Sequence, residues 1–146
     1  MAFGLNDYLN EQFNIEPKDI RTYSPLTLAY IGDAIFDVVI RSILVNKGNT
    51  AVNKLHQRAS SVVKAHTQAA MATALMDSFT DEEADWYRRG RNSKPHTKAK
   101  NATTMDYLEA TGFEAVMGYL YLTGNMDRIC ELINCGIKRL ELDILE

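Results

Sequence analysis

The stretch LTLAYIGDAIFDVVIRSILV, residues 26–45, decides the fold of this 146-residue chain. It is long enough for about five turns of helix, and apolar side chains cover nearly all of it. Its charged residues, Asp33, Asp37 and Arg41, are four apart and therefore form one polar stripe. A helix that is hydrophobic on almost every side belongs at the centre of its fold. We therefore expect Asp33 to be buried and to need a cation, a metal ion or hydrogen-bond donors as its partner.

The composition is typical of one globular domain. The chain is 46% hydrophobic and 24% charged, with a net charge of −3, and it is long enough to bury a core without a metal or a disulfide. Cys130 and Cys135 are five apart in a helical pattern, which places them on different faces and predicts reduced cysteines. There is no signal-peptide pattern and no charge-free stretch of membrane-spanning length. We expect a soluble, cytoplasmic protein.

Helical periodicity predicts an all-α fold, a single domain over residues 1–146 with about six to seven helices. Residues 1–23 are expected to form an N-terminal packing arm over the core. Ser24 followed by Pro25 is a favourable helix start, and Thr80 with Glu83 forms a capping box. We expect helices at residues 24–46, at 51–76 with a break near Ser60, at 80–90, at 105–122 and at 126–145.

The helix expected at residues 105–122 repeats the pattern of the first. Its run GFEAVMGYLYL contains Glu114 as its only charge. Gly118, like Gly32 beside Asp33, costs about 1 kcal/mol of helix propensity, a cost that makes sense where two helices approach closely. We therefore place the two apolar helices against each other, with Asp33 and Glu114 facing a common point.

Two lone carboxylates on two buried helices allow two interpretations. Each could accept hydrogen bonds and have a purely structural role, or the two could share a divalent cation, since Mg²⁺ needs only one or two carboxylates and keeps several waters. Such a cation promotes phosphodiester hydrolysis.

The segment RRGRNSKPHTKAK, residues 88–100, has six basic residues and no acid. We expect a mobile basic loop, which is either merely solvated or follows a phosphate backbone. Its basic residues are Arg88, Arg89, Arg91, Lys94, Lys98 and Lys100. Together with the paired carboxylates, this segment favours a nuclease.

The residues YIGDA at 30–34 resemble the signature helix of the ribonuclease III family, and FEA at 113–115 with Gly118 resembles its second catalytic helix. More narrowly, LTLAYIGDAIFDVVIR, RRGRN and FEAVMGYLYL resemble the Mini-ribonuclease III branch, over about residues 26–140. The resemblance implies an all-helical endoribonuclease that dimerises through the signature helix. It also implies cleavage of double-stranded RNA with Mg²⁺, or Mn²⁺ as a possible substitute, leaving 5′-phosphate and 3′-hydroxyl ends.

By this resemblance, Asp33 and Glu114 are the catalytic metal ligands. The larger relatives carry further carboxylates where this chain has Ala29 and Thr111, so the number of metal ions stays open. Asp37 matches an acidic position that we expect to be structural.

The resemblance also bears on how RNA is held. We find no separate double-stranded-RNA-binding domain in the sequence, so we expect the catalytic dimer itself to bind RNA through the six basic residues.

Three functions stay open at this point. We favour a Mg²⁺-dependent endoribonuclease for double-stranded RNA which, by resemblance, would mature a precursor of large-subunit (23S) ribosomal RNA. The alternatives are a catalytically silent module that binds double-stranded RNA, and a helical scaffold in which both carboxylates are structural.

Overall fold

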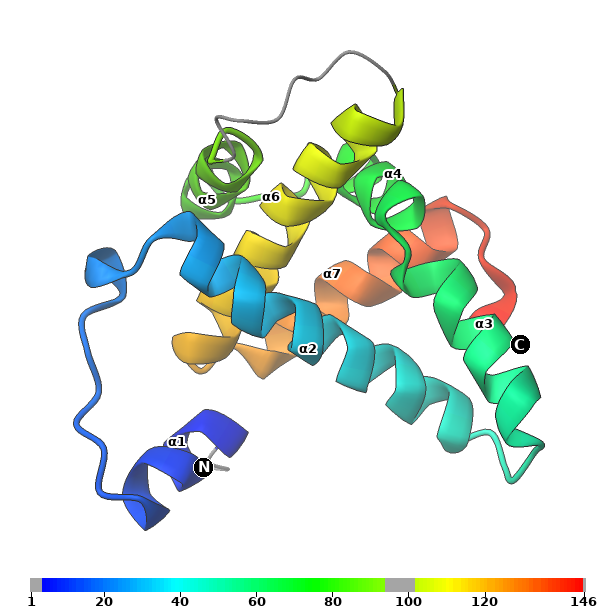
Figure 1. Ribbon diagram of the computed structural model, residues 1–146, viewed down its shortest axis with the longest axis horizontal. Coiled ribbons are helices and arrows are strands. Elements are labelled where there is room, and N and C mark those ends of the chain that lie inside the picture. The colour runs from blue at the N-terminus through cyan, green and yellow to red at the C-terminus, as the bar shows by residue number, and fades with distance from the viewer. Residues whose placement is uncertain (1–3, 94–101, 146) are drawn as a thin grey trace.

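The computed structural model describes residues 4–93 and 102–145, and within these ranges the chain forms helices and no strand (Figure 1). The all-α prediction is therefore confirmed. The seven α-helices and two short 3-10 helices of the described residues are α1 (Leu5–Gln12), η1 (Ile20–Thr22), α2 (Pro25–Val45), α3 (Val52–Val63), α4 (Ala65–Leu75), α5 (Asp81–Arg91), α6 (Ala102–Leu122), α7 (Met126–Arg139) and η2 (Asp143–Leu145).

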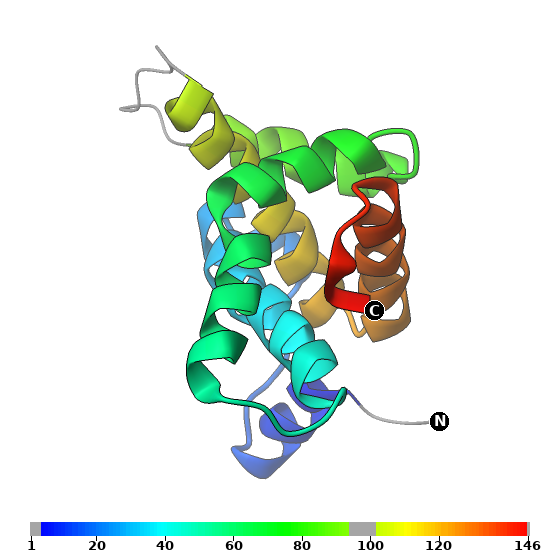
Figure 2. The same cartoon turned by 90° about the vertical axis from the view of Figure 1, so that its right-hand side faces the viewer.

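The helix α6 lies at the centre of the fold. It packs most extensively against α2, α5 and α4, and Figure 1 shows α2 crossing it with α5 on one side and α4 on the other. Where α2 meets α6, the fully buried rings of Phe36 and Phe113 pack edge to face with their centroids 5.1 Å apart. The view in Figure 2 shows α7 beside the C-terminal segment. The long apolar helices predicted from the sequence therefore form the core together.

The crossing of α2 and α6 depends on two glycines. A Cβ atom at Gly32 would lie 1.8 Å from the carbonyl oxygen of Glu114, and one at Gly118 would lie 1.9 Å from the carbonyl oxygen of Leu28. No side chain fits at these distances, so only glycine permits the two backbones to touch. The close approach expected at these glycines is confirmed.

The expectation that α2 is enclosed on every side, with Asp33 buried, is wrong. One side of α2 is buried through Leu28, Phe36 and neighbouring apolar residues. The other side is open, with Tyr30 82% exposed and Val38 58% exposed, and Asp33 itself is exposed. Apolar periodicity in a single chain cannot distinguish a side that packs within the subunit from one that remains uncovered there.

The break between α3 and α4 lies at Lys64 rather than near Ser60. The hydroxyl of Thr67 donates to the Ser61 carbonyl at 2.8 Å, and the Gln68 side-chain amide donates to the Val63 carbonyl at 2.7 Å. Both side chains are buried. They replace the helical partners that α3 loses at its C-terminus, and so they fix the break at this position.

The last helix ends at Arg139, six residues earlier than expected. Glu141 has a positive φ of 54°, and the Leu142 amide donates back to the Ile137 carbonyl at 3.0 Å. This is the hydrogen-bond pattern of a chain leaving a helix through a left-handed residue. Ile144 is nevertheless buried, because η2 folds back onto the core.

The N-terminal arm does not pack as a whole. No residue of α1 is buried, and within residues 4–23 only Ile20 and Tyr23 pack against the core. Cys130 and Cys135 are both free, as predicted. Within residues 4–93 and 102–145, no helix combines the length and the apolarity needed to cross a bilayer.

Candidate active site

Asp33 and Glu114 line the same open hollow, which has a volume of about 340 Å³. The hollow lies between α2 and α6, and its lining residues are Leu26, Ala29, Tyr30, Asp33, Tyr107, Thr111 and Glu114. The two carboxylates that the sequence analysis assigned to a common point are therefore neighbours at one site.

The glycine crossing explains this placement. Asp33 follows Gly32 directly, and the backbone of Glu114 is the group that Gly32 touches. On α6, Tyr107, Thr111 and Glu114 are four and three residues apart, which places them on one face. The carboxylates are thus positioned by two rigid helices in direct backbone contact rather than by loops.

Asp33 and Asp37 have different surroundings although they are one turn apart. Asp33 is exposed within the hollow, and no described residue forms a hydrogen bond or ion pair with it. Asp37 lies outside the hollow and accepts a hydrogen bond from Arg41 Nε at 3.1 Å. The ion pair along α2 therefore uses Asp37 and leaves Asp33 directed to the hollow.

The two positions that the sequence analysis singled out for lacking a carboxylate belong to this same hollow. Ala29 and Thr111 both line it and both are buried. The Thr111 hydroxyl donates to the Tyr107 carbonyl at 3.0 Å, as an ordinary intrahelical bond. Of the residues that line the hollow, Asp33 and Glu114 are the two that carry a carboxylate.

The donor set fits a hydrated Mg²⁺ ion. Among the described residues, no group of three His, Cys, Asp or Glu side chains is placed to enclose a metal. Mg²⁺ does not require such a cage, because it is commonly held by one or two carboxylates and retains several waters. An open hollow with Asp33 and Glu114 on its wall meets this requirement.

The basic segment begins within a helix: Arg88 and Arg89 lie inside the helix expected at residues 80–90, and Arg91, expected in the loop, is its last residue. All three lie in the last turn of α5. The helix continues because its N-terminal turn is acidic and its C-terminal turn basic, which complements the helix dipole. The predicted RNA-binding residues Lys94, Lys98 and Lys100 lie outside the described residues.

Two of these arginines rest on aromatic rings. The Arg89 guanidinium lies 4.2 Å from the centre of the Trp86 ring, and that of Arg91 lies 5.8 Å from the centre of the Tyr87 ring. Arg88 instead pairs with Asp85. Stacking restricts a guanidinium while leaving its N–H groups free to bind another anion.

Hydrogen bonds and burial hold the aromatic rings in place. Trp86 stacks on Tyr119 with ring centroids 5.9 Å apart, and the Tyr119 hydroxyl donates to Glu82 at 2.6 Å. Burial, followed by the bond to Glu82, raises the pKa of Tyr119 to about 12. Burial and the nearby charge of Glu109 raise the pKa of Tyr87 to about 12. Both phenols are therefore neutral donors at physiological pH.

A buried ion pair anchors the start of α5. Glu83 is 2% exposed and receives two hydrogen bonds of 2.9 Å from Arg128 of α7, which also donates to the Ser78 carbonyl at 2.6 Å. Burial alone would raise the pKa of Glu83, but the bonds from Arg128 and the Thr80 amide outweigh it and leave the pKa below its ordinary value. The predicted capping box of Thr80 and Glu83 is also present.

Sequence reasoning did not single out Tyr30 and Tyr107, which also line the hollow. Tyr30 precedes Asp33 by three residues and Tyr107 precedes Glu114 by seven, so each shares a helix face with its carboxylate. This spacing could have identified both tyrosines once the carboxylates had been selected.

Comparisons with known proteins agree with this geometry. The family model described as Ribonuclease III domain matches residues 26–125. The chain is 47% identical to the Mini-ribonuclease 3 of Enterococcus faecalis over 124 residues, which cover 84% of this chain and 94% of that protein. It is 42% identical to the Mini-ribonuclease 3 of Streptococcus pneumoniae over 125 residues, covering 84% and 98% of the two chains.

A solved structure supports the same relationship. A protein from Fusobacterium nucleatum, known from its crystal structure, superposes with a TM-score of 0.73 at 32% sequence identity, covering 83% of this chain and 93% of that one. The segment matched by the family model, residues 26–125, includes all but the first residue of α2 and the whole of α6, and with them the glycine crossing and the hollow. The chain belongs to the ribonuclease III family, a family of endoribonucleases that act on double-stranded RNA.

Proposed function

We propose that Asp33 and Glu114 together hold Mg²⁺ and that the hollow between α2 and α6 is the catalytic centre for cleaving double-stranded RNA. The observation that carries this proposal is the placement of both carboxylates in one hollow, at the point where Gly32 touches the backbone of Glu114. Two like charges beside each other in an open site are well suited to a divalent cation, which would neutralise both.

The chemistry follows from what each group contributes. A divalent cation bound here would supply positive charge for a phosphoryl oxygen and acidify a bound water. Asp33 and Glu114 would hold it, and Mn²⁺ could replace Mg²⁺ because both accept oxygen ligands. The rigid crossing of α2 and α6 fixes the carboxylates before RNA arrives, which reduces the cost of organising the site. The products would carry 5′-phosphate and 3′-hydroxyl ends.

The basic end of α5 and the segment after it are proposed to bind RNA. Arg89 and Arg91, restricted by their aromatic neighbours, are suited to contact phosphates with little loss of conformational freedom. Arg88 and the lysines Lys94, Lys98 and Lys100 would add charge. Contacts to phosphates and 2′-hydroxyls across the minor groove read the shape of an RNA duplex more than its sequence.

The active protein is proposed to be a homodimer that pairs through α2. The uncovered side of α2 presents Tyr30, Val38 and Val45, each more than half exposed, and Tyr30 also lines the hollow. A row of exposed apolar side chains of this kind is typical of a protein interface, and a two-fold pair would cover it symmetrically. Two hollows in one dimer would allow one cut in each RNA strand.

The substrate is proposed to be a precursor of 23S ribosomal RNA, processed in the cytoplasm. The support for this is the similarity to proteins named Mini-ribonuclease 3. Incubation of the purified protein with transcripts carrying the two ends of the precursor, followed by mapping of the ends produced, tests this assignment. Uncut precursor under conditions that cleave another RNA duplex would contradict it.

Cleavage of a long RNA duplex with and without EDTA tests the catalytic proposal. We expect Asp33→Asn and Glu114→Gln to abolish cleavage but retain RNA binding and helical content. Asp37→Asn is the matched control, since Asp37 pairs with Arg41 outside the hollow and should tolerate the change. Unchanged cleavage by either of the first two variants would contradict the catalytic assignment. Binding without cleavage by the unmodified protein would instead favour a silent RNA-binding module.

A further inference from the structure

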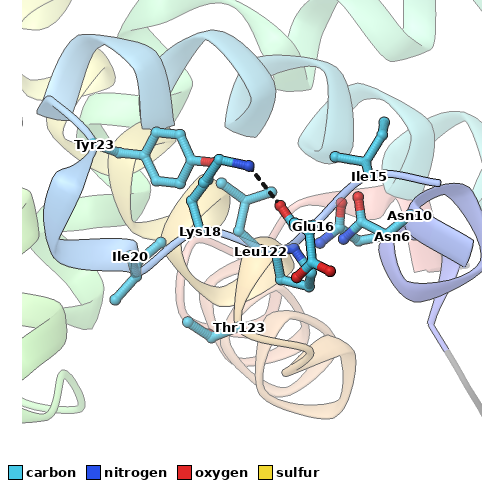
Figure 3. A pocket seen from close by; sticks show the side chains of 10 residues that line it. Asn6, Asn10, Ile15, Glu16, Lys18, Ile20, Tyr23, Leu122 and Thr123 are labelled. Carbon is cyan, nitrogen blue, oxygen red and sulfur yellow. Dashed lines mark hydrogen bonds between the residues drawn. The ribbon is translucent and has the colours of Figure 1, made fainter. Parts of the chain in front are cut away.

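The helix α1 turns its polar side toward its own subunit. Asn6 and Asn10 are half-buried and line a hollow of about 400 Å³ between the arm and the end of α6. Figure 3 shows both asparagines directed from α1 toward this hollow, opposite Leu122 and Thr123. An amphipathic helix that packs on its own core presents the opposite side. The helix α1 is therefore not held on its own subunit by its apolar residues.

The apolar side of the arm is left uncovered. Leu5 is 58% exposed, Tyr8 51%, Leu9 40% and Phe13 68%. They share one side of α1 and its continuation, because their spacings of three, four and five residues keep them within about half a helical turn. Four large apolar side chains grouped in this way are typical of a surface that another molecule covers.

An apolar groove that could receive the apolar side of the arm lies between α2 and α3. It has a volume of about 100 Å³, and its apolar lining consists of Leu44, Val45, Val52, Leu55 and Ala59, with Arg41 and His56 beside them. Val45 and Val52 are each about 60% exposed. The groove adjoins the uncovered side of α2, so it is continuous with the surface proposed for dimerisation.

The charges of the arm and of the groove are opposite. Residues 4–17 carry Asp7, Glu11 and Glu16 and no lysine or arginine. Residues 38–76, which include the groove, contain no acid and five basic residues, Lys47, Lys54, Arg58, Lys64 and Arg41, of which Arg41 is paired with Asp37. Lys54 lines a separate hollow that adjoins the groove. Glu11 is exposed on α1. The apolar lining of the groove favours a protein helix over RNA as its occupant. The positive charge around the groove favours a helix that carries acidic residues.

The chain between the arm and α2 is long enough for exchange between subunits. Of the twelve residues between Gln12 and Pro25, residues 13–19 can extend without releasing Ile20 and Tyr23 from the core, and these seven span about 23 Å. The 21 residues of α2 extend about 31 Å. If α2 crosses its copy in an antiparallel pair, the start of one α2 lies near the end of the other, where the groove is located.

We propose that the arm of one subunit docks its Leu5, Tyr8 and Leu9 side into the groove between α2 and α3 of a second copy of this chain. Glu11 would then lie near Lys54 of the other copy. This inference rests on the proposed homodimer and adds to it a specific interface, in which each subunit contributes an arm and receives one.

Cross-linking between two single-cysteine variants tests the arrangement. In a background with Cys130→Ser and Cys135→Ala, a chain carrying Leu9→Cys is mixed with one carrying Val52→Cys and oxidised. We expect a covalent heterodimer. The control partner carries Asp81→Cys, which is exposed at the start of α5, and should give little product with Leu9→Cys. Circular dichroism verifies that each variant is folded.

Analytical ultracentrifugation separates the two possible failures. A dimer that gives no more cross-link with Val52→Cys than with Asp81→Cys would overturn the inference while leaving the homodimer intact. A monomer at the same concentration would overturn the homodimer and the inference with it.

Charge reversal provides a second measurement. We expect Glu11→Lys or Lys54→Glu to raise the dimer dissociation constant about two- to fivefold, and the double variant to restore it. If Lys54→Glu weakens binding of duplex RNA but leaves dimerisation unchanged, the groove serves RNA and the inference is wrong.

Discussion

Replacement of Gly32 by alanine tests whether the helix crossing positions the carboxylates. The added Cβ would lie 1.8 Å from the Glu114 carbonyl oxygen and 2.7 Å from the Gly118 nitrogen. Ordinary contact begins at 3.4 Å, so α2 and α6 must separate locally by about 1.6 Å. Because both neighbours are backbone, no side-chain rotation can relieve the clash. We expect the free energy of unfolding to fall by at least about 2 kcal/mol, despite about 1 kcal/mol gained in helix propensity.

The expected effect on cleavage is larger than the effect on stability. A displacement of about 1 Å at a catalytic group can reduce a rate about 100-fold, so Gly32→Ala should lose at least that factor at a temperature where it remains folded. Urea denaturation measures the stability, and initial rates on an RNA duplex measure the activity.

Gly136→Ala is the matched control for this experiment. Its Cβ would lie 2.5 Å from Cγ of the fully buried Met71, so we expect a comparable loss of stability, about 1–3 kcal/mol, but normal cleavage at a temperature where the variant remains folded. Gly32→Ala with the stability and activity of the unmodified protein would refute the argument from the crossing.

Further predictions concern the support of α5 and its basic end. Arg128→Ala leaves the buried Glu83 without its partner, so we expect about 3 kcal/mol loss in urea denaturation at pH 7; a loss below 1 kcal/mol would contradict the anchor. The folded-state pKa of Glu83 is lowered, so its stabilisation should be complete above about pH 4.5 and decline as the pH falls through the lowered pKa. Arg128→Ala should remove the part of the acid sensitivity that is due to Glu83. Urea denaturation of both proteins between pH 3 and 6 would show this. Arg89→Ala should weaken binding of any RNA duplex and reduce the salt dependence by about one phosphate contact, and an unchanged salt dependence would exclude Arg89 from the interface.

Much of the fold could be predicted because local signals were strong. Ser24 and Thr80 cap helices where the sequence places them, and Gly32 and Gly118 indicated the crossing because glycine is otherwise unfavourable inside a helix. The pairing of Asp33 with Glu114 followed from their isolation on apolar helices. These signals reside in single residues or short spacings, which one sequence displays directly.

The errors arose where structure depends on distant partners. The open side of α2 carries Tyr30 and Val38 beside its polar stripe, and these large apolar residues led the pattern to predict that Asp33 is enclosed. The α3–α4 break depends on buried Thr67 and Gln68 reaching back to α3 carbonyls.

Binding of Mn²⁺ measured by electron paramagnetic resonance tests the central claim most directly, because it does not depend on RNA. We predict that the unmodified protein and Asp37→Asn bind the ion with similar affinity, and that Asp33→Asn and Glu114→Gln each weaken binding at least tenfold. Equal affinity in all four proteins would contradict the claim that Asp33 and Glu114 hold the cation between them.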